Sequence, residues 1–136
     1  MSDDADAGLL DTSVFIARES GRVIAKLPAR VALSVITIGE LQLGVLNARD
    51  SATRTRRAQT LALARMADPI PVSEAVMVAW ARLLADSRAA GVHRTVKLTD
   101  ALIAATAIEH GLPVVTQDGD FDRNASACQH LSVIKV

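Results

Sequence analysis

The 136-residue sequence is poor in several residue types, and each shortage excludes a class of protein. It holds a single cysteine, Cys128, so it can build neither a disulfide framework nor a cysteine zinc site. With no tyrosine, 2 phenylalanines and 1 tryptophan, it lacks the aromatic platform on which many nucleic-acid-binding sheets stack bases. Its 15 basic residues are balanced by 15 acidic ones, which excludes a globally basic coat for nucleic acid.

The chain also lacks a long hydrophobic run. The stretch 31–46 is interrupted by polar residues, and the apolar stretch 101–108 is too short to span a bilayer. The first residues are acidic, which is the wrong sign for a signal peptide. From these features we expect a cytoplasmic protein. The length predicts one domain over residues 1–136, with the acidic residues 1–7 flexible, and the half of the residues that are hydrophobic can bury a sizeable core.

Short apolar runs alternate with segments of helical periodicity. We expect strands at 8–10, 31–35, 69–72, 113–116 and 132–136. We expect two short helices within 14–27, then helices over 37–46, 54–66, 73–90 and from Thr99 or Asp100 to His110. This alternation predicts an α/β fold with a central parallel sheet of about five short strands flanked by helices.

Carboxylates lie at or near the ends of these strands. Asp11 closes the first strand, Glu40 follows the second by about a helical turn, and Asp100 begins the helix that leads into strand 113–116. Asp118 and Asp120 follow that strand. Open α/β sheets form their sites at the carboxyl ends of strands. Strand endings, helix caps and Asp-Gly turns would explain the aspartates equally well, but an unpaired Glu40 in an apolar stretch would be costly.

Several carboxylates in one cleft repel one another, and their pKa values rise unless a cation neutralises them. Oxygen ligands without histidine or cysteine favour a hard ion, Mg²⁺ or Mn²⁺. Such a site suits phosphodiester hydrolysis, in which one ion activates water and a second stabilises the leaving oxygen.

The segment 46–67 carries a net charge of +4, although the whole chain has a net charge of zero. A basic segment beside an acidic cleft would bring a polyanionic substrate to it, although an ordinary solvated helix face has the same composition. The candidate phosphate contacts are Arg49, Arg54, Arg56 and Arg57, with Arg94 and Lys97 as further candidates.

Other α/β classes lack their motifs here. Asp11-Thr12-Ser13 is without the second aspartate of a haloacid-dehalogenase-type phosphatase. Neither a G-x-G-x-x-G fingerprint nor a P-loop is present, which excludes a Rossmann dinucleotide site and a P-loop nucleotide site.

Four segments, taken in order, resemble PIN-domain ribonucleases and most of all the VapC toxins of bacterial toxin–antitoxin pairs. They are Leu10-Asp11-Thr12-Ser13, Glu40-Leu41-x-x-Gly44, residues 100–107 (DALIAATA) and residues 111–121 (GLPVVTQDGDF). One such motif alone is weak, whereas four at this spacing are specific. The resemblance covers nearly the whole chain, from about Gly8 to Val136.

This resemblance implies a PIN-like fold, usually in a homodimer. It implies a Mg²⁺- or Mn²⁺-dependent endoribonuclease that cuts structured RNA such as tRNA or rRNA. It also implies a VapB-type antitoxin whose C-terminal segment covers the active site. The alternative is a catalytically inactive PIN-like module that binds RNA or protein, and metal dependence discriminates between the two.

The resemblance also assigns roles to individual residues. Asp11, Glu40 and Asp100 match the first three acids of the family, and each would be catalytic and a metal ligand. Asp118 matches the fourth, with Asp120 as the alternative metal ligand. The hydroxyl residues Thr12, Ser13 and Thr116 match positions that hold the acids or bound water, although strand-end and cap hydrogen bonds would explain them too.

Overall fold

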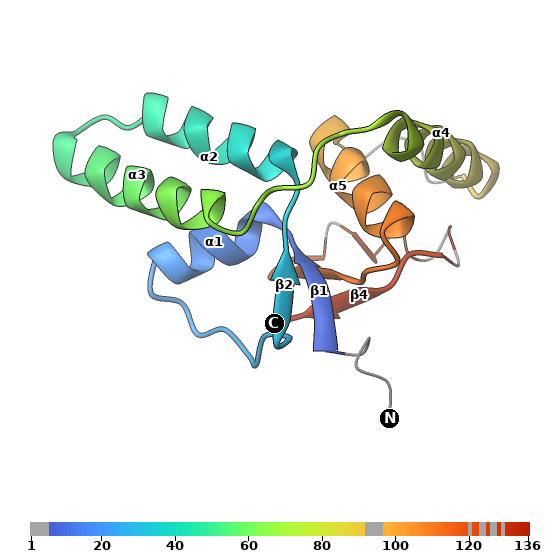
Figure 1. Ribbon diagram of the computed structural model, residues 1–136, viewed down its shortest axis with the longest axis horizontal. Coiled ribbons are helices and arrows are strands. Elements are labelled where there is room, and N and C mark those ends of the chain that lie inside the picture. The colour runs from blue at the N-terminus through green and yellow to red at the C-terminus, as the bar shows by residue number, and fades with distance from the viewer. Residues whose placement is uncertain (1–5, 92–96, 120, 123–124, 126–127, 129) are drawn as a thin grey trace.

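The computed structural model describes residues 6–91, 97–119, 121, 122, 125, 128 and 130–136. In these residues four strands form one parallel sheet in the order β2-β1-β3-β4, and five helices flank it (Figure 1). The elements are β1 (Ala7–Leu10), α1 (Thr12–Glu19), β2 (Arg30–Ala32), α2 (Val35–Leu46), α3 (Ser51–Arg65), α4 (Glu74–Ala89), α5 (Leu98–Glu109), β3 (Val114–Thr116) and β4 (Val133–Lys135). The predicted α/β class with a parallel sheet is confirmed.

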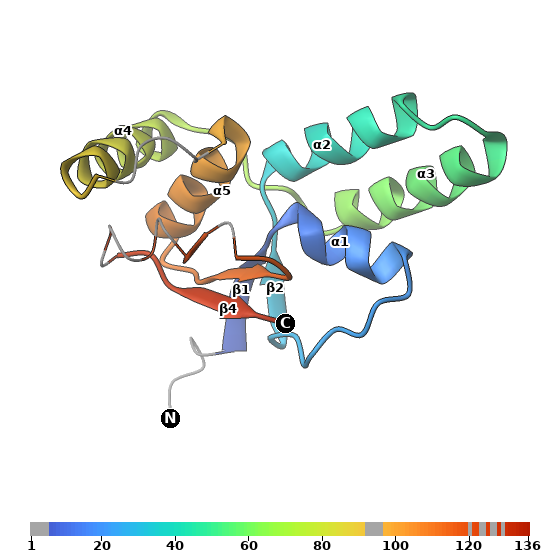
Figure 2. The same cartoon turned by 180° about the vertical axis from the view of Figure 1, so that it is seen from behind.

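The sheet is buried on both faces, and alternation along its two central strands supplies both cores. Leu9 of β1 and Val114 of β3 join one hydrophobic cluster, which includes residues of α4 and α5. The next residues along, Leu10 and Val115, point to the opposite face and join a second cluster with residues of α1, α2 and α3. Figures 1 and 2 show α1, α2 and α3 on one side and α4 with α5 on the other.

The order of the strands places a topological switch point between β1 and β3. From β1 the chain moves outward to β2, and later it returns to the other side of β1 as β3. The crossovers that leave these two neighbouring strands therefore run in opposite directions, and ligands of such sheets commonly bind at the carboxyl ends of the strands at this point. Asp11 directly follows β1, and Asp118 follows β3 by two residues. The fold therefore brings both acids to the carboxyl ends of the two central strands.

The expected strand at 69–72 is not formed, which accounts for a sheet of four strands rather than about five. Only Ile70 pairs there, through a single bridge to Ser34. Its N–H donates to Leu33 O at 2.8 Å and its carbonyl accepts from Val35 N at 3.0 Å. The flanking residues, Pro69 and Pro71, have no N–H to extend the ladder.

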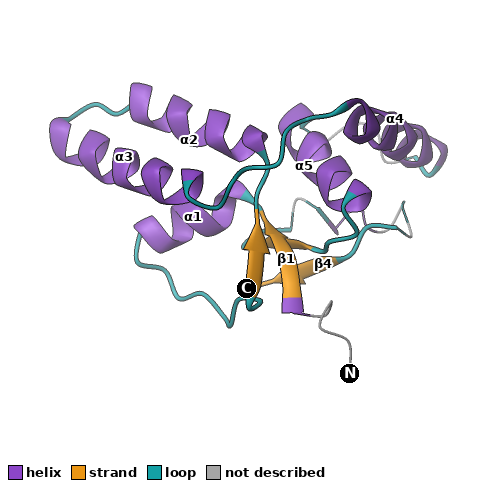
Figure 3. Cartoon of the chain, viewed as in Figure 1, coloured by secondary structure: helices purple, strands orange, loops and turns teal. Residues whose placement is uncertain are grey.

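The predictions for residues 14–35 need two corrections. A single helix, α1, stands where two short ones were expected, and Figure 3 shows the chain from its end to β2 as a loop. Gly21, with a φ of 73°, takes the left-handed conformation that ends a helix. The second strand ends at Ala32 rather than residue 35, because Ser34 caps α2 by accepting from Ile36 N at 3.0 Å.

The later helices follow the predicted pattern with shifted beginnings. Ser73 caps α4 as expected, and its hydroxyl accepts from Val76 N at 3.2 Å. The cap position of α5 is Lys97, so Thr99 and Asp100 lie inside the first turn, where the helix dipole favours an acid. None of the helices described here is long and apolar enough to cross a bilayer.

Candidate active site

Asp11 is a buried carboxylate held by two hydroxyl groups. It directly follows β1, occupies the N-cap position of α1 and is 4% exposed. Ser13 Oγ donates to Asp11 Oδ2 at 2.7 Å, and Thr116 Oγ1 donates to the same oxygen at 2.8 Å. The side chain is therefore fixed by one residue of its own helix and by the last residue of the neighbouring strand β3.

The surroundings of Asp11 oppose its ionisation. Burial raises the pKa of this carboxyl above its ordinary value, and the nearby negative charge of Asp118 raises it further. The hydrogen bonds from Ser13 and Thr116 lower the pKa but do not offset the burial. A positive charge at this point would favour the ionised form, so the site has the electrostatic character of a cation-binding position.

The turn after β3 brings Asp118 to the same hydroxyl group. Thr116 Oγ1 lies 3.4 Å from Asp118 Oδ1, while the backbone N–H of Asp118 donates to Thr116 Oγ1 at 3.2 Å. The N–H of Gln117 donates to Ser13 Oγ at 3.0 Å. Thr116 thus stands between the two carboxylates, and the turn is hydrogen-bonded to both hydroxyls that hold Asp11.

Glu40 is held from α1. Thr12 Oγ1 donates to Glu40 Oε1 at 2.7 Å, and Thr12 Oγ1 also lies 3.0 Å from Thr37 Oγ1. Because Thr12 is the neighbour of Asp11 in the chain, this bond ties the α2 acid to the α1 end of the site. We refer to the residues with these contacts as the acid–hydroxyl network: Asp11, Thr12, Ser13, Thr37, Glu40, Thr116 and Asp118.

Of the remaining predicted residues, the structure describes some and leaves others outside the described ranges. Asp100 is half-buried in the first turn of α5, a helix that packs against α2. Asp120 and Arg94 lie outside the described residues. Asp122 is exposed and forms an ion pair with Lys135 at 3.4 Å, which agrees with its position outside the motif.

The donor set fits a hard divalent cation in chemistry and in number. Across the described ranges, no three histidine, cysteine or acidic side chains lie close enough to enclose a metal ion. Mg²⁺ does not need such a cage, because it keeps several waters and binds through one or two carboxylates together with substrate phosphates. The buried Asp11, with Asp118 across Thr116, supplies two carboxylates of this kind.

Several of the predicted arginines are used within the protein. Arg57 Nη1 donates to Gly44 O at 2.6 Å, and Arg54 Nη2 donates to Ala48 O at 3.1 Å. Both carbonyls belong to the end of α2 or the turn after it, where helical partners run out. Arg56 is more exposed, and its Nε lies 3.9 Å from Glu19 Oε2. These contacts fasten α3 to α2 and to α1, while Arg49 and Lys97 are exposed.

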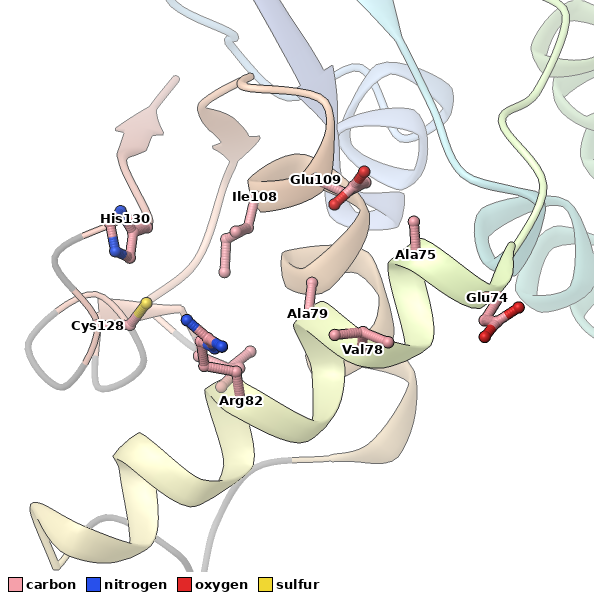
Figure 4. Close-up of a pocket in the computed structure, with 10 residues that line it drawn as sticks. Glu74, Ala75, Val78, Ala79, Arg82, Ile108, Glu109, Cys128 and His130 are labelled. Atoms are coloured by element: carbon pink, nitrogen blue, oxygen red, sulfur yellow. The ribbon is translucent and has the colours of Figure 1, made fainter.

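A cavity of about 610 Å³ lies between α4, the end of α5, Cys128 and His130 (Figure 4). None of the predicted acids that the structure describes lines it. Its walls are largely apolar, and its charged side chains come from Glu74, Arg82 and Glu109. The candidate site is therefore identified by the position of the acids at the carboxyl ends of the central strands, and not by the size of a cavity.

Comparison with known proteins identifies the family of this chain. Residues 8–127 match the PIN domain family. Ribonuclease VapC8 of Mycobacterium tuberculosis is 79% identical over 104 residues, which cover 76% of this chain and 93% of that protein. Ribonuclease VapC5 of the same species is 45% identical over 123 residues, covering 89% of this chain and 90% of the relative. The chain belongs to the PIN-domain family and, within it, to the VapC ribonucleases.

A solved structure supports the assignment to this family. The crystal structure of VapBC-5 from Mycobacterium tuberculosis, a toxin–antitoxin complex, superposes on this chain with a TM-score of 0.84 at 40% identity. The match covers 96% of this chain and 99% of that one. The PIN-like fold expected from the motifs is therefore confirmed, with the four described strands in place of about five.

Two residues of this PIN-domain site were missed at the sequence level. Thr37 is fully buried and contacts Thr12, and Gln117 donates through Nε2 to Val136 O at 2.6 Å. A signal for Thr37 is present in the sequence: it precedes Glu40 by three residues, so the two side chains share a helix face. The contact of Gln117 with the last residue of the chain leaves no local pattern.

Proposed function

We propose that this VapC-type chain is a Mg²⁺- or Mn²⁺-dependent endoribonuclease toxin that hydrolyses phosphodiester bonds in structured RNA such as tRNA or rRNA. The observation that carries the proposal is the buried Asp11, held by Ser13 and Thr116 beside Asp118 at the carboxyl edge of the sheet. A carboxylate kept in this unfavourable setting is typical of a functional site.

The proposed ligands are Asp11, Glu40, Asp100 and Asp118, with Asp120 as an alternative. Because no three of the described acids lie close enough to enclose one ion, some of these acids would bind the ion through its water molecules. When bound, a divalent ion would supply charge neutralisation and Lewis-acid chemistry for hydrolysis at the phosphate. The protein's own contribution is orientation. Ser13 and Thr116 hold one oxygen of Asp11, and Thr12 holds one oxygen of Glu40, so the carboxylates are positioned before RNA arrives.

RNA would approach over the exposed cations. Arg49 and Arg56 on the α2–α3 side and Lys97 before α5 are exposed and can contact phosphates. Arg54 and Arg57 would combine a phosphate contact with their bonds to the α2 carbonyls. Because tRNA and rRNA are the proposed substrates, we place the reaction in the cytoplasm.

We also propose a VapB-type antitoxin as inhibitor and a second copy of the chain as partner in a homodimer. An apolar groove of about 350 Å³ between α1, α3 and β2 supports the first, since Phe15, Leu63 and Met66 line it. Met66 is 83% exposed and would be covered by an apolar antitoxin segment. Leu63→Asp with Met66→Asp should weaken co-purification with the product of the neighbouring reading frame, and unchanged recovery would contradict this location.

The test of the activity is cleavage of total cellular RNA by the purified, antitoxin-free protein, with Mg²⁺, with Mn²⁺ and with EDTA. Asp11→Asn is the diagnostic variant, because it removes the buried charge and keeps the shape of the side chain. Asp122→Asn is the matched control, since Asp122 is an exposed aspartate outside the acid–hydroxyl network.

We expect discrete fragments that require both the ion and Asp11, and equal cleavage by Asp122→Asn and the unaltered protein. Cleavage by Asp11→Asn, or in EDTA, would contradict the assignment. If the unaltered protein cuts nothing in a pool that contains tRNA and rRNA, the binding-only module becomes the better description.

A further inference from the structure

The hydroxyl of Thr12 has one proton, and the contacts decide where it goes. A carboxylate can only accept, so the 2.7 Å contact between Thr12 Oγ1 and Glu40 Oε1 uses that proton. The 3.0 Å contact between Thr12 Oγ1 and Thr37 Oγ1 must then run the other way, with Thr37 as donor. The side chains form a directed chain from Thr37 to Thr12 to Glu40.

Ser13 and Thr116 also donate their single proton to a carboxylate, but the groups that donate to them are of a different kind. Ser13 donates to Asp11 and accepts from the backbone N–H of Gln117. Thr116 donates to Asp11 and accepts from the backbone N–H of Asp118. Thr12 instead accepts from a side chain, so its orientation depends on the identity of one residue.

We propose that Thr37 is a positioning residue for Glu40, which it orients through the hydroxyl of Thr12. Thr37 is fully buried and Thr12 is 7% exposed, so bulk water does not reach the pair to replace the missing donor. A hydroxyl that accepts a hydrogen bond is polarised and donates more strongly, which strengthens the bond to Glu40. The inference rests on the proposed function, in which Glu40 binds the cation.

The chain contains a matched control for this proposal. Thr106 is also a fully buried helical threonine, but its hydroxyl donates to Leu102 O of its own helix at 2.8 Å. Thr37→Val and Thr106→Val remove the same atom from equally buried sites and cost comparable packing. Only the first removes a donor from the network, and Thr37→Ser restores that donor.

We expect Thr37→Val to lower the single-turnover cleavage rate and the affinity for Mn²⁺, measured by electron paramagnetic resonance of free Mn²⁺. The expected loss is about 10-fold, the range seen when residues that orient metal ligands are removed. Thr37→Ser and Thr106→Val should stay close to the unaltered protein in both measurements, and the affinity for RNA should be unchanged in all variants.

Crystal structures of the variants supply a result independent of activity. The bond between Thr12 and Glu40 should be lost or lengthened in Thr37→Val and kept in Thr37→Ser. An unmoved Glu40 in Thr37→Val, an equal loss in Thr106→Val, or failure of Thr37→Ser to restore Mn²⁺ affinity would each overturn the proposal. An inactive unaltered protein would instead overturn the proposed function, and the orientation of Glu40 would still decide the role of Thr37.

Discussion

The acid–hydroxyl network and the α2–α3 hairpin use charged residues in opposite ways. In the network, a buried carboxylate, Asp11, is held by the hydroxyl of Ser13, two residues along the chain, and by that of Thr116 on a distant strand. In the hairpin, which extends away from the sheet in Figure 2, Arg54 and Arg57 on α3 bond to backbone carbonyls at the end of α2. The network leaves the negative charge of Asp11 poorly compensated at the carboxyl ends of the strands. In the hairpin, the arginines donate to carbonyls near the end of α2 that have no partner within the helix.

This difference shows where a residue's type predicts its role. A buried carboxylate is costly unless it is paired, hydrogen-bonded or bound to a metal ion. An acid directly after a buried central strand therefore indicates one of these roles. An exposed arginine can bind phosphate, bond a carbonyl or remain solvated at nearly equal free energy. The sequence therefore indicates the acids more strongly than the arginines, and the experiments below test both sides.

The largest effect is expected at Asp100. Asp100→Asn should reduce RNA cleavage at least about 100-fold, because residues that only orient metal ligands already cost about 10- to 100-fold. The fold should be kept, since the side chain is half-buried and the substitution preserves its shape. Single-turnover cleavage and circular dichroism measure the two, with Glu109→Gln, an exposed acid on the same helix, as control. Full activity in Asp100→Asn would remove it from the proposed site.

The hairpin should control RNA affinity rather than chemistry. Replacing Arg54, Arg56 and Arg57 with alanine should weaken RNA binding. The slope of the logarithm of the binding constant against the logarithm of the salt concentration should become shallower by roughly 0.7–0.9 for each lost phosphate contact. Filter binding at several salt concentrations measures this, with Arg82→Ala/Arg88→Ala on α4 as control. An unchanged salt slope would assign these arginines to a purely internal role.

A smaller effect separates the internal role from the phosphate contact. Arg57→Ala leaves the Gly44 carbonyl without its donor and should lower the free energy of unfolding by about 1–2 kcal/mol. Arg56→Ala removes only a long ion pair from an exposed arginine, while Glu19 keeps its hydrogen bond from Thr60, so the free energy of unfolding should change by less than about 0.5 kcal/mol. Urea denaturation measures both, and equal values would mean that the α2 end does not depend on Arg57.

The smallest expected effect is on the pH dependence of thermal stability, which should have opposite signs for Asp11 in the network and Asp50 in the hairpin. Burial raises the pKa of Asp11, so its contribution to stability is full below its ordinary pKa of 3.8 and is lost as pH rises through the raised value. In EDTA at pH 7, Asp11→Asn should therefore unfold at a higher temperature than the unaltered protein, and the gap should close toward pH 4.

Asp50, the cap of α3, provides the comparison. Its pKa is lowered by hydrogen bonds from the backbone and side chain of Thr53, so its contribution is present at neutral pH and lost on acidification. Asp50→Ala should thus destabilise most at pH 7. Thermal scans from pH 4 to 7 measure both variants, and the same sign of pH dependence in both would contradict this account.

Much of the fold followed from local pattern, and the exceptions have local physical causes. The short apolar runs that contain Leu9-Leu10 and Val114-Val115 predicted the central strands, because a strand that is buried on both faces is apolar at consecutive positions. The strand at 69–72 was overestimated, since hydrophobicity does not show that two prolines leave Ile70 alone to pair. The order of the strands depends on packing between distant segments and had no local signal.

The site was predictable to the level of its acids but not of its contacts. Residue type and position at strand ends led to Asp11, Glu40 and Asp118, which the structure links through hydroxyls. The role of Thr37 depends on how α1 packs against α2, and the anchoring of Arg57 on how α3 meets α2. Both are tertiary facts, and the sequence shows only the residue types that make them possible.

The single bridge at Ile70 also bears on how the protein behaves at high concentration. An exposed sheet edge is a template on which a foreign chain can add a strand and begin aggregation. Just past the end of β2, the outermost strand on one side of the described sheet, Ile70 forms a single bridge to Ser34, with Pro69 and Pro71 on either side of it. Because neither proline has an N–H to donate, a foreign strand cannot form a regular ladder with this segment, which disfavours strand addition at this point.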